Sequence, residues 1–201
     1  NTPRLWTVGR GSPAGVVVYR HHAFPARYRE GVFTVCWTMG RVDFSPLTRA
    51  GSTFRAPHLE TFMEAVGDRG FAPVDVVVGP AGDLFVAIGG RGTVGSVYRV
   101  RYTGPRTPAP ERHDPLQQVL AADQPLASWS RAKWVPQARQ LGARAFEHAA
   151  ANPKLSLAGR IRAVEVLVEV FAGLRPDLAR QLSRDADPEI VARLAWALTR
   201  S

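Results

Sequence analysis

The chain has 201 residues, 45% of them hydrophobic, and a formal net charge of +9 at pH 7. This hydrophobic content is enough for one or two small cores and excludes intrinsic disorder. The longest apolar run, Ile161 to Leu174, is interrupted by charged residues and is shorter than the roughly 18 residues that a membrane span needs. We therefore expect no membrane span in this segment.

The positive charge is almost entirely arginine, because only Lys133 and Lys154 are lysines. The arginines are spread along the chain without a basic run, so a nucleic-acid partner is not expected. Cys36 is the only cysteine. This excludes an internal disulfide, a paired-cysteine zinc site and a two-cysteine haem attachment motif within the segment, and we expect Cys36 to be an ordinary core residue.

The part of the chain up to about Gly104 predicts short β-strands, because β-branched and aromatic runs alternate with glycine and proline. The predicted strands are Gly15 to Tyr19, Gly31 to Trp37, Val74 to Val78, Leu84 to Ile88 and Ser96 to Tyr102. Pro80, Ala81 and Gly82 predict a tight turn between two of them.

The part from about Pro115 onward predicts α-helices, because apolar residues recur at spacings of three and four, as in Ile161, Val164, Leu167, Val168 and Phe171. Asp187 before Pro188 predicts the N-cap of a further helix. Between the two parts, Thr103 to Pro115 carries four prolines and predicts a linker.

Both parts contain internal similarities. The run that begins at Gly31 resembles the run that begins at Gly82, 51 residues later, and Arg162 to Leu167 resembles Arg193 to Leu198, 31 residues later. Periods of this size are typical of propeller blades and of helical repeats. The fold class predicted is mixed, with separate β and α regions: the last blades of a β-propeller followed by an α-helical HEAT-like solenoid.

The expected domains are incomplete propeller blades at residues 1–104, a Pro-rich linker with a first short helix at 105–128, and incomplete HEAT-like repeats at 129–201. Two blades cannot close a ring. We therefore expect the chain to be a fragment of a larger protein.

The runs GFAPVDVVVGPAGDLFVA and GGRGTVGSVYRVRYTG, within residues 70–104, resemble the closing blade of sugar and sorbosone dehydrogenase-like propellers. Residues 11–42 are similar to the preceding blade of that group, which includes large secreted planctomycete proteins with HEAT repeats and a haem-binding domain. The resemblance implies a six-bladed propeller, a periplasmic or extracellular location and oxidation of a carbohydrate substrate. Its implied cofactors are PQQ and calcium, with haem c only outside this segment.

The sequence departs from the quinone-dependent members at the positions where they carry basic residues. Those positions are occupied here by Thr38 and Met39 in one turn and by Ala72, Pro73 and Val74 before the next strand. By the same resemblance, the chain is a fragment of a secreted dehydrogenase-like propeller whose HEAT repeats act as an interaction arm for a protein partner. The alternative function is a non-catalytic propeller-solenoid that binds glycans or proteins on the central face of the propeller.

Two residues are candidate ligand-binding positions. The carboxylate of Asp75, at the start of a strand, could orient a ligand or metal, or it could only cap a turn. Arg91, inside Gly89-Gly90-Arg91-Gly92-Thr93, could present its guanidinium to an anionic ligand, or it could be a solvated residue at a hairpin tip.

The sequence identifies no catalytic residue and no metal site. His21 and His22 are adjacent and would face opposite sides of a strand, and the remaining histidines, His58, His113 and His148, are isolated. Neither a P-loop nor the Gly-x-Ser-x-Gly motif of hydrolases is present. Trp129 and Trp134 are expected to pack the first helical repeat against the propeller.

Overall fold

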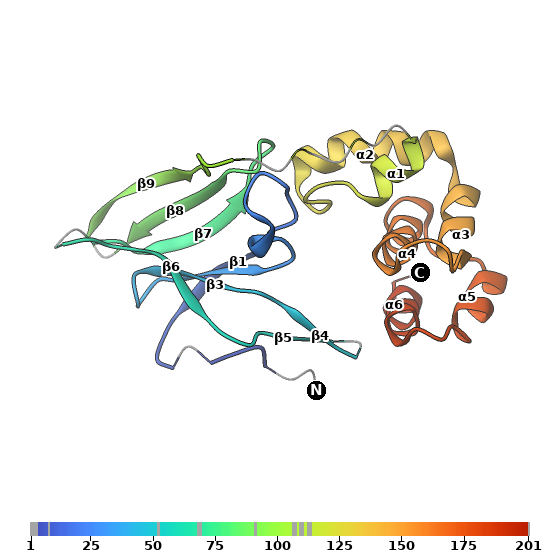
Figure 1. Cartoon of the computed structure of the whole chain (residues 1–201), viewed down its shortest axis with the longest axis horizontal. Helices are drawn as coiled ribbons and strands as arrows, with labels where there is room; N and C mark the ends of the chain where they lie inside the picture. Colours follow the sequence, from blue (N-terminus) through green and yellow to red (C-terminus); the bar gives the residue numbers. More distant parts are fainter. Residues whose placement is uncertain are drawn as a thin grey trace. The chain divides into compact units, whose positions relative to one another are not determined.

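The structure is a computed structural model that describes residues 4–7, 9–51, 53–67, 70–90, 92–105, 108, 111 and 114–200. It divides into two compact units. Residues 1–50 and 54–109 form the first, called here the β unit, and residues 51–53 and 110–201 form the second, called the helical unit. Figure 1 shows the strands of the β unit and the helices of the helical unit.

Strands occupy the first half of the chain. Over the described residues they are β1 (Pro13–Val18), β2 (Val32–Cys36), β3 (Arg41–Ser45), β4 (Thr48–Ala50), β5 (Thr53–Arg55), β6 (Glu60–Glu64), β7 (Pro73–Val78), β8 (Leu84–Gly90) and β9 (Thr93–Val100). One turn of 3-10 helix lies at Ala26–Tyr28. The strands form a sheet of order β1-β2-β3-β6, a two-stranded pair β4-β5, and a sheet of order β7-β8-β9. The two larger sheets are antiparallel throughout.

The two larger sheets pack face to face, because β7 contacts both β1 and β2. Alternate residues of each strand point into the space between them, as the period of a pleated strand requires. The resulting core is rich in aromatic rings. Its buried members are Tyr19, Phe24, Tyr28, Phe33, Val35, Val42, Phe44, Val76, Val78, Leu84, Val86 and Ile88.

The turn between β7 and β8 is held by the segment that follows β1. Gly82 has a φ of +80°, which favours glycine, and a Cβ at this position would lie 2.2 Å from Nδ1 of His21. The Tyr19 hydroxyl donates to the Gly82 carbonyl at 2.8 Å and accepts from the Phe24 amide at 3.0 Å. The two sheets are therefore connected by a buried hydrogen-bonded corner as well as by apolar contacts.

The helical unit contains, over the described residues, α1 (Pro115–Leu120), α2 (Ser128–Leu141), α3 (Ala143–Ala151), α4 (Leu157–Phe171), α5 (Pro176–Leu182) and α6 (Pro188–Leu198). Asp114, Ser156 and Asp187 cap three of these helices by accepting hydrogen bonds from first-turn amides. The apolar faces of α3 and α6 pack on α4, whose Ala163, Val164, Val166 and Leu167 are buried. None of the helices in the described part of the chain is both long and apolar enough to cross a membrane.

The predicted fold class, the last blades of a six-bladed β-propeller followed by a HEAT-like solenoid, is wrong. Among the described residues the sheets have four, two and three strands, none is closed, and six helices complete a mixed α/β arrangement. The sheets are not copies of one unit, because β4 and β5 are inserted between β3 and β6 and have no counterpart in the second sheet. The helices are equally irregular, since those before α4 and α6 have nine and seven residues.

Several local predictions are confirmed. Strands form at all five predicted positions, with ends shifted by up to three residues. The turn at Pro80, Ala81 and Gly82 forms, with the Gly82 amide donating to the Gly79 carbonyl at 2.9 Å. The side chain of Asp187 accepts from the Glu189 amide at 2.9 Å, as an N-cap does.

Candidate functional site

Asp75 lies in β7, next to Gly15 of β1. Its side chain is exposed, and its Oδ1 accepts a hydrogen bond from the Val76 amide at 2.8 Å. The register of β7 against β8 shifts between Pro73 and Asp75, and a Cβ at Gly15 of β1 would lie 2.6 Å from Asp75 Oδ1. The carboxylate therefore has a local structural role at an irregular point of the strand.

The glycine-rich loop joins β8 to β9. Arg91 lies outside the described residues, so its predicted role stays a prediction. The described part of the loop is fixed by Trp37, whose Nε1 donates to the Gly89 carbonyl at 3.0 Å. Gly90 has a φ of +87°, and a Cβ there would lie 3.2 Å from the same Trp37 nitrogen. The positive φ and the close approach of Trp37 explain Gly90 through backbone geometry.

The positions that would hold a quinone do not fit that group. PQQ carries several carboxylates and needs fixed cationic donors. The hydroxyl of Thr38 accepts from the Ser12 amide at 2.8 Å, and Met39 beside it is uncharged. Ala72 and Pro73 are buried, and Val74 is an apolar side chain on the surface. No step through PQQ or its calcium ion is derived for this chain.

The pair His21 and His22 is placed differently from what the sequence predicted, whereas the packing of Trp129 and Trp134 against the strand region stays a prediction. His21 and His22 follow β1 rather than lying in a strand, and their rings stack with centroids 4.4 Å apart. His58 and His148 are exposed, and His113 lies outside the described residues. Trp134 is a core residue of the helical unit itself, where its Nε1 donates to the Pro125 carbonyl at 2.9 Å. Cys36 is buried, as expected.

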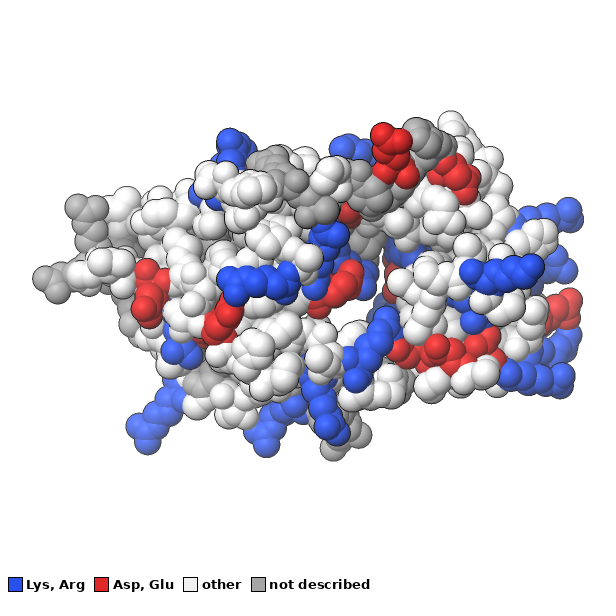
Figure 2. Space-filling model, viewed as in Figure 1, with Lys and Arg blue, Asp and Glu red and all other residues white. Residues whose placement is uncertain are grey.

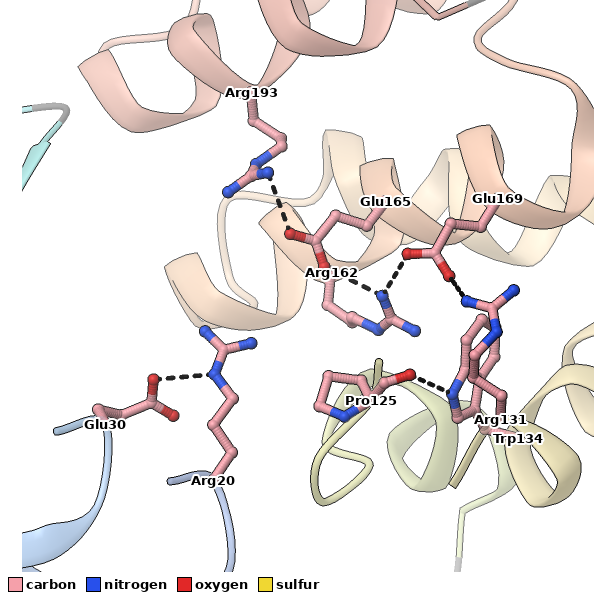
Figure 3. A network of polar contacts seen from close by, with 9 residues as sticks. All are labelled: Arg20, Glu30, Pro125, Arg131, Trp134, Arg162, Glu165, Glu169 and Arg193. Carbon is pink, nitrogen blue, oxygen red and sulfur yellow. Dashed lines mark hydrogen bonds and ion pairs between the residues drawn. The ribbon is translucent and has the colours of Figure 1, made fainter. Parts of the chain in front are cut away.

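A network of charged side chains connects α2, α4 and α6 (Figure 3). Arg162 of α4, with a side chain only 5% exposed, donates from Nη1 to Glu165 at 3.0 Å and to Glu169 at 3.1 Å. Glu169 also binds Arg131 of α2, and Glu165 pairs with Arg193 of α6 at 3.3 Å.

An aromatic ring completes this network. The guanidinium carbons of Arg162 and Arg131 lie 4.4 and 5.2 Å from the centroid of the Trp134 ring, a cation–π arrangement. Nε and Nη2 of Arg162 are buried without a hydrogen-bond partner. The ion pairs of Arg162, Glu165 and Glu169 with Arg131 and Arg193 connect three helices.

A second buried arginine fixes the entrance to α6. Arg160 donates from Nε to the Ala150 carbonyl at 3.0 Å and binds both carboxylate oxygens of Asp185. The hydrogen bond from Arg160 lowers the pKa of Asp185 below its usual 3.8, although burial acts in the opposite direction. This pair ties the loop before α6 to α4 and to the end of α3.

The sheet β7-β8-β9 has one face outside the core. The side chains of Val77, Phe85, Ala87, Val97 and Arg99 lie on this outer face, opposite to those of Val76, Leu84 and Val86 in the core. Val77 is 50% exposed and Val97 is 65% exposed. The outer face is therefore apolar along its middle.

Arg99 and Arg101 bind one carboxylate at the end of this face. Nε of Arg99 and Nε of Arg101 lie 2.6 and 3.4 Å from Oδ2 of Asp83. The side chain of Asp83 is 2% exposed, whereas those of the two arginines are 48% and 49% exposed. One buried negative charge is thus shared by two half-exposed positive ones.

Strand β9 is the most accessible element of the β unit. From Val94 to Arg99 every residue is exposed, and the strand pairs only with β8 in the sheet order of the described residues. Its pairing with β8 is regular from Ser96 to Val100. One edge of β9 therefore leaves N–H and C=O groups without a strand partner.

On the face drawn in Figure 2, the charged side chains do not gather into one patch. Figure 2 shows blue and red side chains interspersed over the visible face of both units. The net charge of +9 is therefore not concentrated on one element of that face.

Sequence reasoning missed the residues that the structure brings together most closely. From the sequence alone, Asp83 is typical of a turn, and Arg99 and Arg101 are typical of charged residues at the end of a strand. Their separation of two residues was the available signal, because positions i and i+2 of a strand share one face. In the sequence, an apolar run is interrupted by Arg162, Glu165 and Glu169. Their spacings of three and four residues place them on one side of a helix.

Comparison with protein-family models, curated proteins and solved structures finds no match for the chain. Sugar oxidation and a periplasmic or extracellular location therefore stay predictions that rest on the resemblance alone.

Proposed function

We propose that this chain is a non-catalytic binding module that recruits a protein partner by pairing strand β9 with an extended segment of that partner. The observation that carries the proposal is the open edge of β9, a strand of eight residues that is exposed from Val94 to Arg99. Strand addition of this kind supplies affinity through main-chain hydrogen bonds and specificity through alternate side chains.

The other edge strands of the two larger sheets carry features that discourage pairing. β1 begins at Pro13 and shifts its register before Gly15, and β7 begins at Pro73 and shifts before Asp75. β6 carries Glu60 and Glu64, and its pairing with β3 is also irregular. Proline, bulges and charges are the usual protection of sheet edges.

Strand β9 has less of this protection. It contains neither proline nor an acidic residue, and its only irregularity against β8 comes at its start, between Ile88 and Gly90. Val94, Val97 and Tyr98 are exposed apolar side chains along it. A long, regular and apolar edge is suited to accept a strand.

The test is selection from a phage library of short random peptides on the purified chain. We expect the selected peptides to raise the hydrogen-exchange protection of β9 amides and to leave β1 and β6 amides unchanged. Peptides that bind without protecting β9 would overturn the proposal, and so would a selection that yields no peptide.

Proline substitution supplies the matched control. Successive N–H groups of a strand point to opposite edges, so one of Ser96 and Val97 donates toward β8 and the other toward the open edge. Ser96→Pro and Val97→Pro therefore differ in effect. The variant that keeps the native circular dichroism spectrum is expected to lose peptide binding, because it lacks the outward donor.

A further inference from the structure

We infer that the segment recognised by β9 is acidic, with two carboxylates on one side of the strand followed by an apolar residue. This inference rests on the proposed strand pairing and specifies its partner. The side chains that would face the partner are Val97 and Arg99, on the outer face of β9, and Arg101, which follows the end of the strand and binds the same carboxylate as Arg99.

The arginines keep binding capacity after they contact Asp83. Arg99 directs both Nε and Nη2, and Arg101 directs Nε, toward the same oxygen, Oδ2 of Asp83. One carboxylate balances only one of the two positive charges. The guanidinium of an arginine has five N–H donors, so each side chain retains donors for a second carboxylate. About half of each side chain is exposed, 48% for Arg99 and 49% for Arg101.

Local charge favours an acidic segment over a second copy of the chain. β9 has no acidic residue, and the carboxylate that Arg99 contacts, Asp83, is shared with Arg101. Edge-to-edge pairing of two copies would bring together two arginine-bearing strands from chains that each carry a net charge of +9. Like charges across a strand pair are destabilising.

The order of side chains in the partner follows from geometry. Antiparallel pairs are more stable per residue than parallel pairs and outnumber them. From its N-terminus onward, an antiparallel partner strand places residues opposite Arg101, then opposite Arg99 and then opposite Val97. One partner residue lies between each of these positions and the next. The expected pattern is acidic-x-acidic-x-apolar, in which cross-strand neighbours have Cβ atoms about 5 Å apart.

The probe is acetyl-Thr-Glu-Thr-Glu-Thr-Val-Thr-amide, titrated into the full chain while the backbone amide resonances are recorded by NMR. A matched peptide carries glutamine in place of both glutamates. We expect the glutamate peptide to shift β9 amides and to bind about threefold to tenfold more tightly than the glutamine peptide. Salt should remove most of this difference, because the arginines are exposed.

The protein variants are Arg101→Gln and, as its control, Arg20→Gln. Arg101→Gln keeps the Arg99–Asp83 contact and is expected to reduce the preference for glutamate. Arg20 is an arginine of the same unit with a comparable exposure of 46%, it pairs with Glu30, and its replacement should leave the preference unchanged.

The outcomes separate the two proposals. If neither peptide shifts the β9 amides, strand pairing and the acidic partner are both wrong. If the two peptides bind equally, strand pairing stands and only the acidic preference is wrong. If the β9 amides shift with protein concentration alone, the occupant is a second copy, and the acidic partner is again excluded.

Discussion

Arg160 and Asp185 form the buried ion pair whose titration is easiest to isolate. The side chains are 9% and 16% exposed, and the Asp185 carboxylate also accepts from the Asp187 amide at 3.0 Å. Because the folded state lowers the pKa of Asp185, it favours the ionised carboxylate. The stabilisation is present above the unfolded value near 3.8 and is lost as the pH falls through the lowered folded value.

Replacing Asp185 by asparagine tests this pair. We expect Asp185→Asn to lower the free energy of unfolding at pH 7 by about 2–3 kcal/mol, because Arg160 is left buried without its counter-charge. Urea titrations between pH 7 and pH 3 should show the difference from the parent chain shrinking below pH 4.

Asp177 is the matched control for Asp185. It pairs with Arg180, but its side chain is 73% exposed. Asp177→Asn should therefore change the free energy of unfolding by less than about 1 kcal/mol. Equal losses from the two substitutions would contradict the assignment of a buried clamp to Arg160 and Asp185.

Gly82 tests the corner between the two sheets. In Gly82→Ala the new Cβ would meet His21 Nδ1 at 2.2 Å and the Cβ of Ala23 at 2.4 Å, so the buried corner has to move. We expect a loss of about 3 kcal/mol, which combines the left-handed backbone strain with the steric clash. Thermal unfolding followed by circular dichroism measures it.

Gly51 is the control that separates backbone strain from steric clash, the two contributions expected in Gly82→Ala. It also has a positive φ, +63°, but nothing lies within 4 Å of a Cβ built on it. Gly51→Ala should therefore cost only the backbone strain, about 1–2 kcal/mol. If Gly82→Ala lowers stability no more than Gly51→Ala does, the residues around Gly82 can move to accept the new Cβ without a steric cost.

At the scale of elements, Glu169 determines how firmly α2 is attached to α4. It accepts from Arg131 of α2 and from Arg162 of α4, and its side chain is 16% exposed. Glu169→Gln should lower the free energy of unfolding by about 3 kcal/mol and raise hydrogen exchange in α2. Exchange followed by mass spectrometry resolves the helices.

Gln137 supplies the control for this element. It donates to Gln118 at 2.6 Å in a solvent-exposed hydrogen bond between α2 and α1. Gln137→Ala removes an inter-helix contact of α2 without touching a buried charge, so exchange in α2 should change little. If both substitutions loosen α2 to the same extent, the buried network has no special role.

Comparing the predicted with the observed strands shows which of them sequence patterns can predict. Val74 to Val78 and Leu84 to Ile88 were predictable, because their β-branched runs flank a glycine turn. β3, β4, β5 and β6 lie outside the five predicted strands. Thr48–Ala50 and Thr53–Arg55 are too short for a periodic signal, and Glu60–Glu64 is half polar. Once these strands are present, the 51-residue spacing no longer describes two equal sheets.

The site residues were harder to predict than the strands. Asp75 was singled out for its place at a strand start, but its carboxylate binds its own backbone neighbour, Val76. The shared contact of Arg99 and Arg101 with Asp83 forms only when β9 pairs with β8 and brings the turn with Asp83 beside them. That proximity is tertiary, and no single stretch of sequence encodes it.

For the whole molecule, the decisive feature is that the two units have separate cores. The core of the β unit contains residues from Val17 to Tyr102, and that of the helical unit contains residues from Leu116 to Ala197. A residue buried in one core contributes no apolar area to the other. We therefore expect the two units to unfold as separate cooperative segments.

Gly82→Ala and Asp185→Asn together test this separation. Hydrogen exchange under mild urea should show Gly82→Ala lowering the protection of β2, β7 and β8 while α4 and α6 keep theirs. Asp185→Asn should do the reverse, because the partners of Asp185 among the described residues, Arg160 and Asp187, lie in the helical unit. Loss of protection in both units from either substitution would mean that the chain unfolds as one cooperative structure. In that case β9 could not pair with a partner strand without altering the stability of the helices.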